Sequence, residues 1–327
     1  MILADALRPS PDRTWDYAIQ TGIKHAVIGV PWNPPGTTPN GSFDLTSYAD
    51  WKALYDLYES RGLRPVVVEG APEPAHESIK RGDANRDQSI ETVLNYLPIL
   101  DKLNLRTICI NWMPYKGWYR TRNNIPARGG ALVTGFYQED IPDAEPLLIT
   151  QQELWDNLAY FLKAVGPSLE KYGVKLAFHP DDPPVPRLGD VERILINKGN
   201  YEKLLNIVPS AFIGITLCQG CFCAMGEDIY DIITHYSRRE KVFFVHFRDI
   251  QGSPHSFCET FHDIGPTDMV RCLELYRDYG FNGPVRVDHV PTMAGDDNSR
   301  PGYAAVGRLF ALGYLKGILD ALHYPYS

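Results

Sequence analysis

Four side chains of types that bind metal ions stand at the ends of four separate apolar segments of this chain. The segments are VKLAFH ending at His179, FIGITLC ending at Cys218, VFFVH ending at His246 and PVRVD ending at Asp288. Continuous apolar runs of this length are typical of parallel strands that are buried on both faces. In a (β/α)8 barrel the catalytic residues stand at the C-terminal ends of such strands. The four residues therefore predict a divalent metal ion at the catalytic mouth of a barrel.

Two imidazoles, a thiolate and a carboxylate form a mixed set of nitrogen, sulfur and oxygen ligands. Such a set suits Mn²⁺, Fe²⁺, Co²⁺ or Zn²⁺ better than Mg²⁺ or Ca²⁺, which prefer oxygen ligands alone. The thiolate by itself favours Zn²⁺, so the ligand types do not decide the metal. We take Mn²⁺ as the expected ion, with Fe²⁺ and Co²⁺ as alternatives. For any one of the four residues, ordinary packing at the barrel mouth is a competing explanation.

Two neighbouring features leave alternatives open. Cys218, Cys221 and Cys223 form a C-x-x-C-x-C motif, which could hold a structural zinc ion, but no second cysteine pair has the usual zinc spacing. We therefore expect only Cys218 to be a ligand and the other two to pack in the following loop. Asp181 and Asp182 follow His179, and they either orient the metal ligands or stabilise their loop.

The rest of the chain supports a barrel, because eight apolar segments alternate with eight helical patterns. A doubly wound parallel sheet is the alternative, but no G-x-G-x-x-G motif follows the first strand. We predict a single (β/α)8 domain over residues 1–327. The expected strands are 1–6, 25–31, 64–70, 106–112, 174–179, 212–218, 242–247 and 284–289. The expected helices lie near 12–22, 46–62, 86–103, 151–172, 199–208, 226–239, 266–280 and 302–323.

Local signals set several boundaries of these elements. Thr46 or Ser47 could cap the second helix, and Thr150 with Glu153 forms a capping-box pattern. Gly173 and Gly280 follow two helices as stop signals. Residues 113–150 form the longest insertion, and its position after the fourth strand predicts a lid or a substrate-binding loop.

Composition excludes several classes of protein. The 327 residues are 44% hydrophobic and 22% charged, and the net charge of −8 argues against a nucleic-acid partner. No apolar stretch is long enough to span a membrane, and the N-terminus lacks the features of a secretion signal. Cys109 in a strand and Cys272 in a helix suit reduced, buried thiols, so we expect a cytoplasmic protein. The sequence leaves open whether the chain forms a homo-oligomer.

Several motifs resemble the mannonate dehydratase family, in order along the chain from about residue 64 to about residue 323. They are HPDDPP (179–184), CQG (218–220), HFRD (246–249), ETFHDIGPTDM (259–269), VDH (287–289), RPGYAAVGRL (300–309) and, more loosely, INWMPYKGWYRT (110–121). The resemblance implies a xylose-isomerase-like barrel that dehydrates the sugar acid D-mannonate to 2-keto-3-deoxy-D-gluconate in hexuronate breakdown. It assigns the metal to the same four residues chosen above, and it makes His289 and Tyr303 catalytic.

The chain departs from the family pattern in loops that would contact substrate. The segment between the fourth and fifth strands is shorter than in the longer members. Gly70 stands where the family commonly has a serine, so a hydroxyl is lost. The family often has Asp-Trp-Thr-Arg-Thr-Asp where residues 117–122 read GWYRTR, which keeps Trp118 and Arg120 but neither acid. These changes leave the metal ligands intact and put the preferred sugar acid in question.

Loss of water from a sugar acid needs a base for the C2 proton and an acid for the departing C3 hydroxyl. A bound divalent metal would stabilise the charge that develops. The sequence does not say which of His289 and Tyr303 is the acid and which is the base. Arginines suit the carboxylate, because their planar group can donate two parallel hydrogen bonds. The expected substrate contacts are Trp118, Arg120, Asp181, Arg248, His262 and Arg308.

Two other functions compete with the dehydratase. A metal-dependent sugar isomerase or epimerase on the same fold would keep the water, although a cysteine ligand argues against the carboxylate-rich sites of those enzymes. A regulatory barrel without activity would be expected to lose ligands, and here the set is complete. A further alternative is a dehydratase acting on a different aldonic acid.

Overall fold

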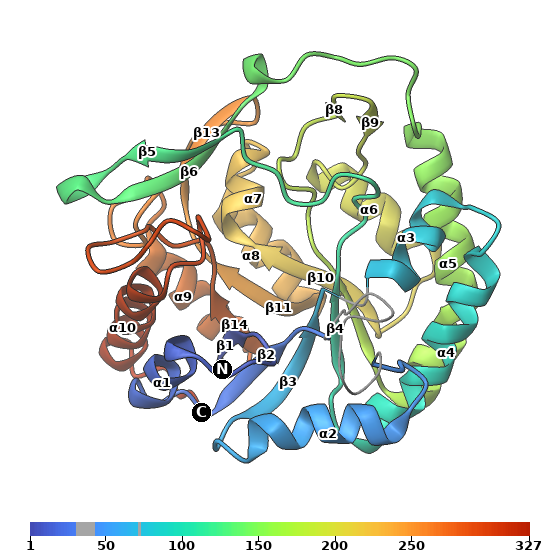
Figure 1. The fold of residues 1–327 in the computed structure, drawn as a ribbon, viewed down its shortest axis with the longest axis horizontal. Coiled ribbons are helices and arrows are strands. Elements are labelled where there is room, and N and C mark those ends of the chain that lie inside the picture. Colours follow the sequence, from blue (N-terminus) through green and yellow to red (C-terminus); the bar gives the residue numbers. More distant parts are fainter. Residues whose placement is uncertain (31–42, 71–72) are drawn as a thin grey trace.

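Eight parallel strands close into a barrel in the computed structural model, which describes residues 1–30, 43–70 and 73–327 (Figure 1). The strand order around the barrel is β1-β14-β11-β10-β7-β4-β3-β2, so each strand pairs with its neighbour in the series of strand–helix units. The predicted (β/α)8 TIM barrel is confirmed. The strands are β1 Ile2–Leu7, β2 His25–Ile28, β3 Arg64–Glu69, β4 Thr107–Ile110, β7 Lys175–Phe178, β10 Ile213–Cys218, β11 Val242–Phe247 and β14 Pro284–Val287.

Helices surround the barrel, and two of them were not predicted. The helix α3 follows β3 directly, and the six-residue helix α7 begins right after Cys218. Cys221 and Cys223 therefore lie in a helix and not in the expected loop. The helices are α1 Arg13–Gln20, α2 Tyr48–Glu59, α3 Glu73–Arg81, α4 Arg86–Lys102, α5 Gln151–Tyr172, α6 Lys198–Ile207, α7 Gln219–Ala224, α8 Ile229–Arg238, α9 Met269–Asp278 and α10 Ala305–Ala321.

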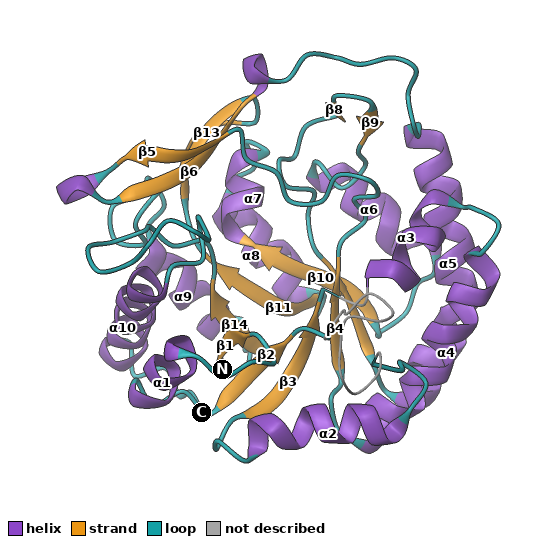
Figure 2. Cartoon of the chain, viewed as in Figure 1, coloured by secondary structure: helices purple, strands orange, loops and turns teal. Residues whose placement is uncertain are grey.

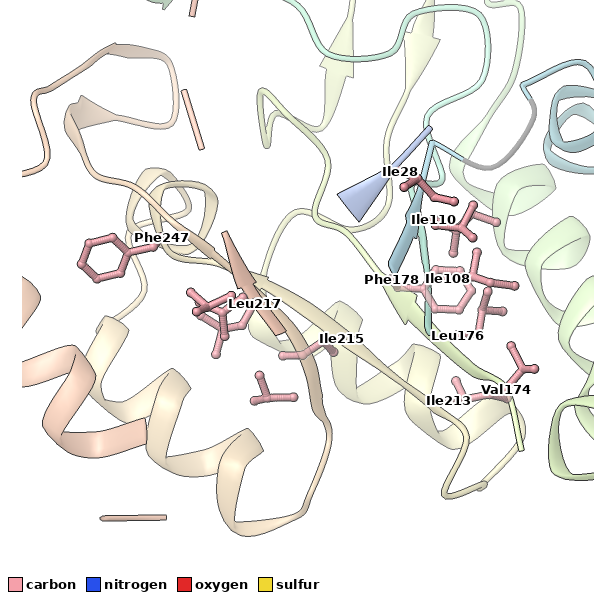
Figure 3. Packing of buried hydrophobic residues seen from close by; sticks show 14 of the residues in the cluster. Ile28, Ile108, Ile110, Val174, Leu176, Phe178, Ile213, Ile215, Leu217 and Phe247 are labelled. Atoms are coloured by element: carbon pink, nitrogen blue, oxygen red, sulfur yellow. The ribbon is translucent and has the colours of Figure 1, made fainter. Parts of the chain in front are cut away.

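The side chains of each strand alternate between two environments, because successive side chains point to opposite faces of the sheet. One set faces the helices and forms the main apolar core, and Figure 3 shows Ile108, Leu176 and Ile215 among its members. The other set faces the barrel interior, where Ala177 and Phe244 pack in a small cluster. A residue that comes two positions after the last interior residue of a strand therefore faces the mouth of the barrel.

The insertion after β4 is not a simple loop. It contains β5 Arg122–Pro126 and β6 Leu132–Tyr137, which pair with β12 Ile250–Ser253 and β13 Ser256–Glu259 in an antiparallel sheet of order β12-β13-β6-β5. Figure 2 shows this sheet beside the barrel. A short hairpin, β8 Arg187–Leu188 with β9 Val191–Glu192, occupies the loop after β7. Whether the insertion works as a lid stays a prediction.

Most predicted boundary signals are confirmed. Ser47 accepts a hydrogen bond from the backbone of Asp50, and Thr150 with Glu153 forms the full capping box. Gly173 has φ 62° at the end of α5, which is the left-handed conformation that glycine adopts without strain. The helices α8, α9 and α10 each begin three residues later than predicted. Asp228 and Asp268 set the starts of α8 and α9, because their side chains accept hydrogen bonds from backbone N–H groups of the first turn.

Other sequence expectations have mixed outcomes. All six cysteines are unpaired, and Cys109 and Cys272 are buried as expected. Within the described residues, no helix combines the length and the apolar character that a membrane crossing requires. Residue 31 of the expected second strand and residues 71–72 after Gly70 lie outside the described residues.

Candidate active site and metal centre

The four predicted metal ligands come together at the mouth of the barrel. His179, Cys218, His246 and Asp288 each offer one ligand atom, and these atoms all lie within 4.8 Å of one another. Their positions follow from strand alternation: Ala177 and Phe244 face the barrel interior, and His179 and His246 come two residues later on the same face. Four strands therefore place four potential ligands close together.

The two histidines are oriented so that unprotonated nitrogens face each other. His179 Nδ1 lies 2.7 Å from the Pro180 carbonyl oxygen, which can only accept, so the proton belongs on Nδ1 and Nε2 carries a lone pair. His246 Nε2 lies 3.1 Å from Glu69 Oε1, and the negative carboxylate favours a proton on Nε2, although the two groups are not aligned for a hydrogen bond. His179 Nε2 and His246 Nδ1 are 3.1 Å apart. Two lone pairs at this distance require a cation or a proton between them.

Electrostatics at this point also favour a cation. Burial opposes ionisation of Cys218, but a hydrogen bond with Cys221 and the Arg248 charge lower the pKa of the thiol well below its ordinary value. Burial likewise opposes ionisation of Asp288, but Arg286 and His289 hold its pKa well below the usual range. Buried thiolate and carboxylate groups beside lone pairs are the donor set of a mixed transition-metal site. The residues present therefore fit a divalent metal ion.

The partner of His246 is Glu69, which sequence analysis did not select. Burial raises the pKa of Glu69, but the charge of Arg286 and the contact with His246 outweigh this and bring it to about 2. Arg286 donates to both oxygens of Glu69, at 2.8 and 2.6 Å, and to Asp288 Oδ1 at 2.6 Å. Glu69 ends β3 and Arg286 faces inward from β14, so the strand-end and alternation rules could have identified both.

His289 and Tyr303 are in direct contact beside the metal ligands. His289 Nε2 is hydrogen-bonded to the Tyr303 hydroxyl at 3.0 Å, and His289 Nδ1 lies 3.0 Å from Glu259 Oε1 and also contacts Arg248. The backbone of His289 has φ 35°, a left-handed conformation that costs about 1–3 kcal/mol for a residue with a side chain. Such strain is typical of functional positions, because the surrounding contacts must hold it.

The pocket above these groups has a volume of about 150 Å³. Of the expected substrate contacts, Trp118 lines it, and its ring packs against His289 and Tyr303 with centroids 5.0 and 5.8 Å apart. Gly70 and Asn111 line the pocket too. A Cβ atom on Gly70 would meet no atom of the described residues within 4 Å, so the missing hydroxyl leaves open space there.

Arg120 and Arg248 form the pocket's supporting wall rather than its surface. Arg120 donates to Asp182 Oδ1 at 2.6 Å and to Glu259 Oε1 at 2.6 Å, and Arg248 lies 3.0 Å from Asp182 Oδ2. All four groups are buried. Gly220 of the CQG motif packs so closely on Arg248 that a side chain there would collide with it. Neither arginine lines the pocket in the described residues. Their contacts favour a role in holding Asp182 and Glu259, and substrate contact by these arginines stays a prediction.

Three other expected substrate contacts are placed away from the pocket. Asp181 Oδ2 accepts hydrogen bonds from the backbone N–H groups of residues 194 and 195, so it stabilises the loop after β7. His262 Nε2 is hydrogen-bonded to the Phe247 carbonyl oxygen. Arg308 pairs with Asp5 at 3.1 Å and joins α10 to β1. All three are buried, and their positions favour structural roles over substrate contact.

Comparisons with known proteins show the family of this chain. The family model of D-mannonate dehydratase matches residues 20–152 and 147–326. The chain is 33% identical over 300 residues to mannonate dehydratase 2 of Halalkalibacterium halodurans, covering 83% of this chain and 86% of the relative. The chain belongs to the D-mannonate dehydratase family. The members that it matches carry the name of a hydro-lyase.

Solved structures support the same assignment. The crystal structure of mannonate dehydratase from Streptococcus suis aligns with a TM-score of 0.87 and 28% identity, over 98% of this chain and 93% of that one. D-psicose 3-epimerase from Clostridium cellulolyticum aligns with a TM-score of 0.60 and 15% identity, over 99% of each chain. The second match shows a shared barrel fold and carries no information about the reaction.

Proposed function

We propose that this member of the family is a metal-dependent sugar-acid dehydratase, with D-mannonate as the lead substrate and 2-keto-3-deoxy-D-gluconate and water as products. The observation that carries the proposal is the convergence of four ligand atoms within 4.8 Å, next to the paired His289 and Tyr303. Family membership supplies the reaction class.

His179, Cys218, His246 and Asp288 would hold the metal, and Mn²⁺ is the proposed ion. When bound, the metal would supply Lewis-acid stabilisation of the negative charge that develops as the C2 proton leaves. Glu69 keeps the proton of His246 on Nε2, so that Nδ1 stays available as a ligand atom. The Pro180 carbonyl oxygen does the same for His179.

Proton transfer is assigned to His289 and Tyr303. Burial, together with the charge of Asp288, raises the pKa of Tyr303, so the phenol keeps its proton and is suited to donate it. We therefore assign Tyr303 as the acid for the departing hydroxyl and His289 Nε2 as the base for the C2 proton. Glu259 stabilises the charge that His289 gains and fixes the orientation of its ring.

The Trp118 ring closes one side of the pocket against both catalytic residues. This contact excludes water from the space between the imidazole and the phenol, which strengthens each electrostatic interaction there. The wall of Arg120, Asp182, Arg248 and Glu259 keeps that arrangement rigid through buried ion pairs. The open space at Gly70 is available to a hydroxyl group of a sugar acid.

The test is a screen of purified, Mn²⁺-loaded protein against a panel of aldonic acids, with products identified by mass. A dehydratase gives a keto-deoxy acid lighter than the substrate by one water, whereas an isomerase or epimerase gives an isobaric product. The His289→Ala variant is the control for contaminating activity. Isobaric products alone, or turnover that His289→Ala does not change, would contradict the proposal.

A further inference from the structure

A second cavity, of about 630 Å³, adjoins the metal pocket on the side of β1 and β2. The two cavities share Glu69, Arg286 and Tyr303 as lining residues, so they are neighbouring compartments at one barrel mouth. We name the second cavity the arginine chamber, because four arginine side chains line it. They are Arg8, Arg286, Arg300 and Arg308.

Two of these arginines are already neutralised and two are not. Arg286 pairs with Glu69 and Asp288, and Arg308 pairs with Asp5. Across residues 1–30, 43–70 and 73–327, neither Arg8 nor Arg300 forms an ion pair or a side-chain hydrogen bond.

Both unpaired guanidinium groups line the chamber at the barrel mouth, where a ligand can reach them. Ala4 packs in the barrel interior, and Arg8 follows it by four residues and is exposed. Arg300 is half-buried. Burial lowers its pKa, as do the charges of Arg8 and Arg308, while Asp12 is the carboxylate that acts in the opposite direction. Asp12 itself accepts hydrogen bonds from the backbone N–H and the hydroxyl of Thr14 at the start of α1.

We infer that the arginine chamber binds a second anionic group, carried by the substrate at the end opposite its reacting carboxylate. Guanidinium groups bind carboxylate and phosphate oxygens through paired, charge-assisted hydrogen bonds. The neutral terminal hydroxyl of an aldonic acid would leave Arg8 and Arg300 without a counter-charge. Within the proposed dehydratase function, the preferred substrate is therefore not D-mannonate itself but a sugar acid with two anionic ends. This is either a dicarboxylic sugar acid or an aldonic acid phosphorylated at its terminal carbon.

This inference rests on the proposed function, since it places the reacting end of the substrate at the metal ligands. One feature of the neighbouring metal pocket bears on the room available to a substrate. Gly70, which replaces the serine common in the family, lines the neighbouring metal pocket and leaves space there.

The test compares three ligands that share one skeleton: D-mannonate, D-mannarate and D-mannonate 6-phosphate. Each is measured for kcat/KM and for equilibrium binding by calorimetry, with the wild-type protein and with Arg8→Met and Arg300→Met. Arg271→Met is the matched control, because Arg271 is an exposed arginine on α9 that does not line the chamber. Hydrogen bonds to charged groups predict an advantage of about 10- to 100-fold for one of the doubly charged ligands.

We expect this advantage to fall to about twofold in Arg8→Met and Arg300→Met and to persist in Arg271→Met. The ligand that is preferred decides between a carboxylate and a phosphate. If D-mannonate is dehydrated and neither doubly charged ligand binds better, the chamber inference is wrong and the proposed function stands. If no ligand is dehydrated but a doubly charged one binds more tightly through Arg8, the chamber stands and the proposed function fails.

Discussion

Replacing Tyr303 by phenylalanine removes one hydroxyl group and keeps the ring that packs against Trp118 and His289. Among the described residues, the hydroxyl makes one side-chain hydrogen bond, 3.0 Å long, to His289 Nε2. Loss of one such bond costs about 0.5–1.5 kcal/mol of folding free energy, which lowers the melting temperature by no more than about 4 °C. If Tyr303 donates the proton to the leaving hydroxyl, kcat should fall on the order of 10²–10⁴-fold.

The two effects differ enough to be separated. A fall of 10²–10⁴-fold in kcat corresponds to about 2.7–5.4 kcal/mol on the activation barrier, which exceeds the stability loss. The assay is steady-state release of the keto-deoxy acid, combined with thermal denaturation and metal content. Tyr324→Phe is the control, because Tyr324 also uses its hydroxyl for one hydrogen bond, to the Phe281 carbonyl oxygen, far from the site. A kcat in Tyr303→Phe within about fivefold of that in Tyr324→Phe would refute the role of the phenol as acid.

Three further changes test the metal centre and the role of an arginine. Glu69→Gln should weaken metal affinity by about 10–100-fold, since it removes the carboxylate that orients His246. Titration of the metal-free protein with Mn²⁺ measures this affinity, and an unchanged affinity would refute the orienting role of Glu69. Cys218→Ser should lower metal content measured by elemental analysis while the circular dichroism stays the same, and full occupancy with full activity would reassign Cys218 to packing. Arg308→Met should destabilise the fold by about 3–5 kcal/mol, because it leaves buried Asp5 without its partner. Adding Asp5→Asn should restore most of that loss in urea denaturation, whereas lost activity at unchanged stability would return Arg308 to substrate binding.

The strand ends of the barrel could be predicted because parallel strands leave a simple pattern in the sequence. Each strand is a short apolar run, and the fold places the residues at its C-terminal end in the mouth. The inward face then repeats every second residue, which selects Cys218 at the end of β10 and Asp288 just after β14. The same rules apply to Glu69 and Arg286, and a stricter use of alternation would have found them.

Contacts between distant segments could not be predicted in this way. Glu259 reaches His289 because β13 joins the insertion strand β6 in one sheet. That pairing joins segments more than a hundred residues apart, and neither strand has a regular hydrophobic alternation. The buried partner of an arginine is equally invisible in sequence: Arg308 meets Asp5 across 303 positions. Whether such an arginine forms an ion pair within the fold or stays free to bind substrate depends on the partner that the fold places beside it.

Metal dependence of water loss is the central claim, and one measurement tests it most directly. The protein is stripped of metal with a chelator, divided, and assayed with the panel of sugar acids before and after Mn²⁺ is restored. We predict that a keto-deoxy acid forms only after metal is restored, at a rate that rises with occupancy of the site formed by His179, Cys218, His246 and Asp288. Product formation at the same rate in the metal-free protein, or an isobaric product after reloading, would contradict the account.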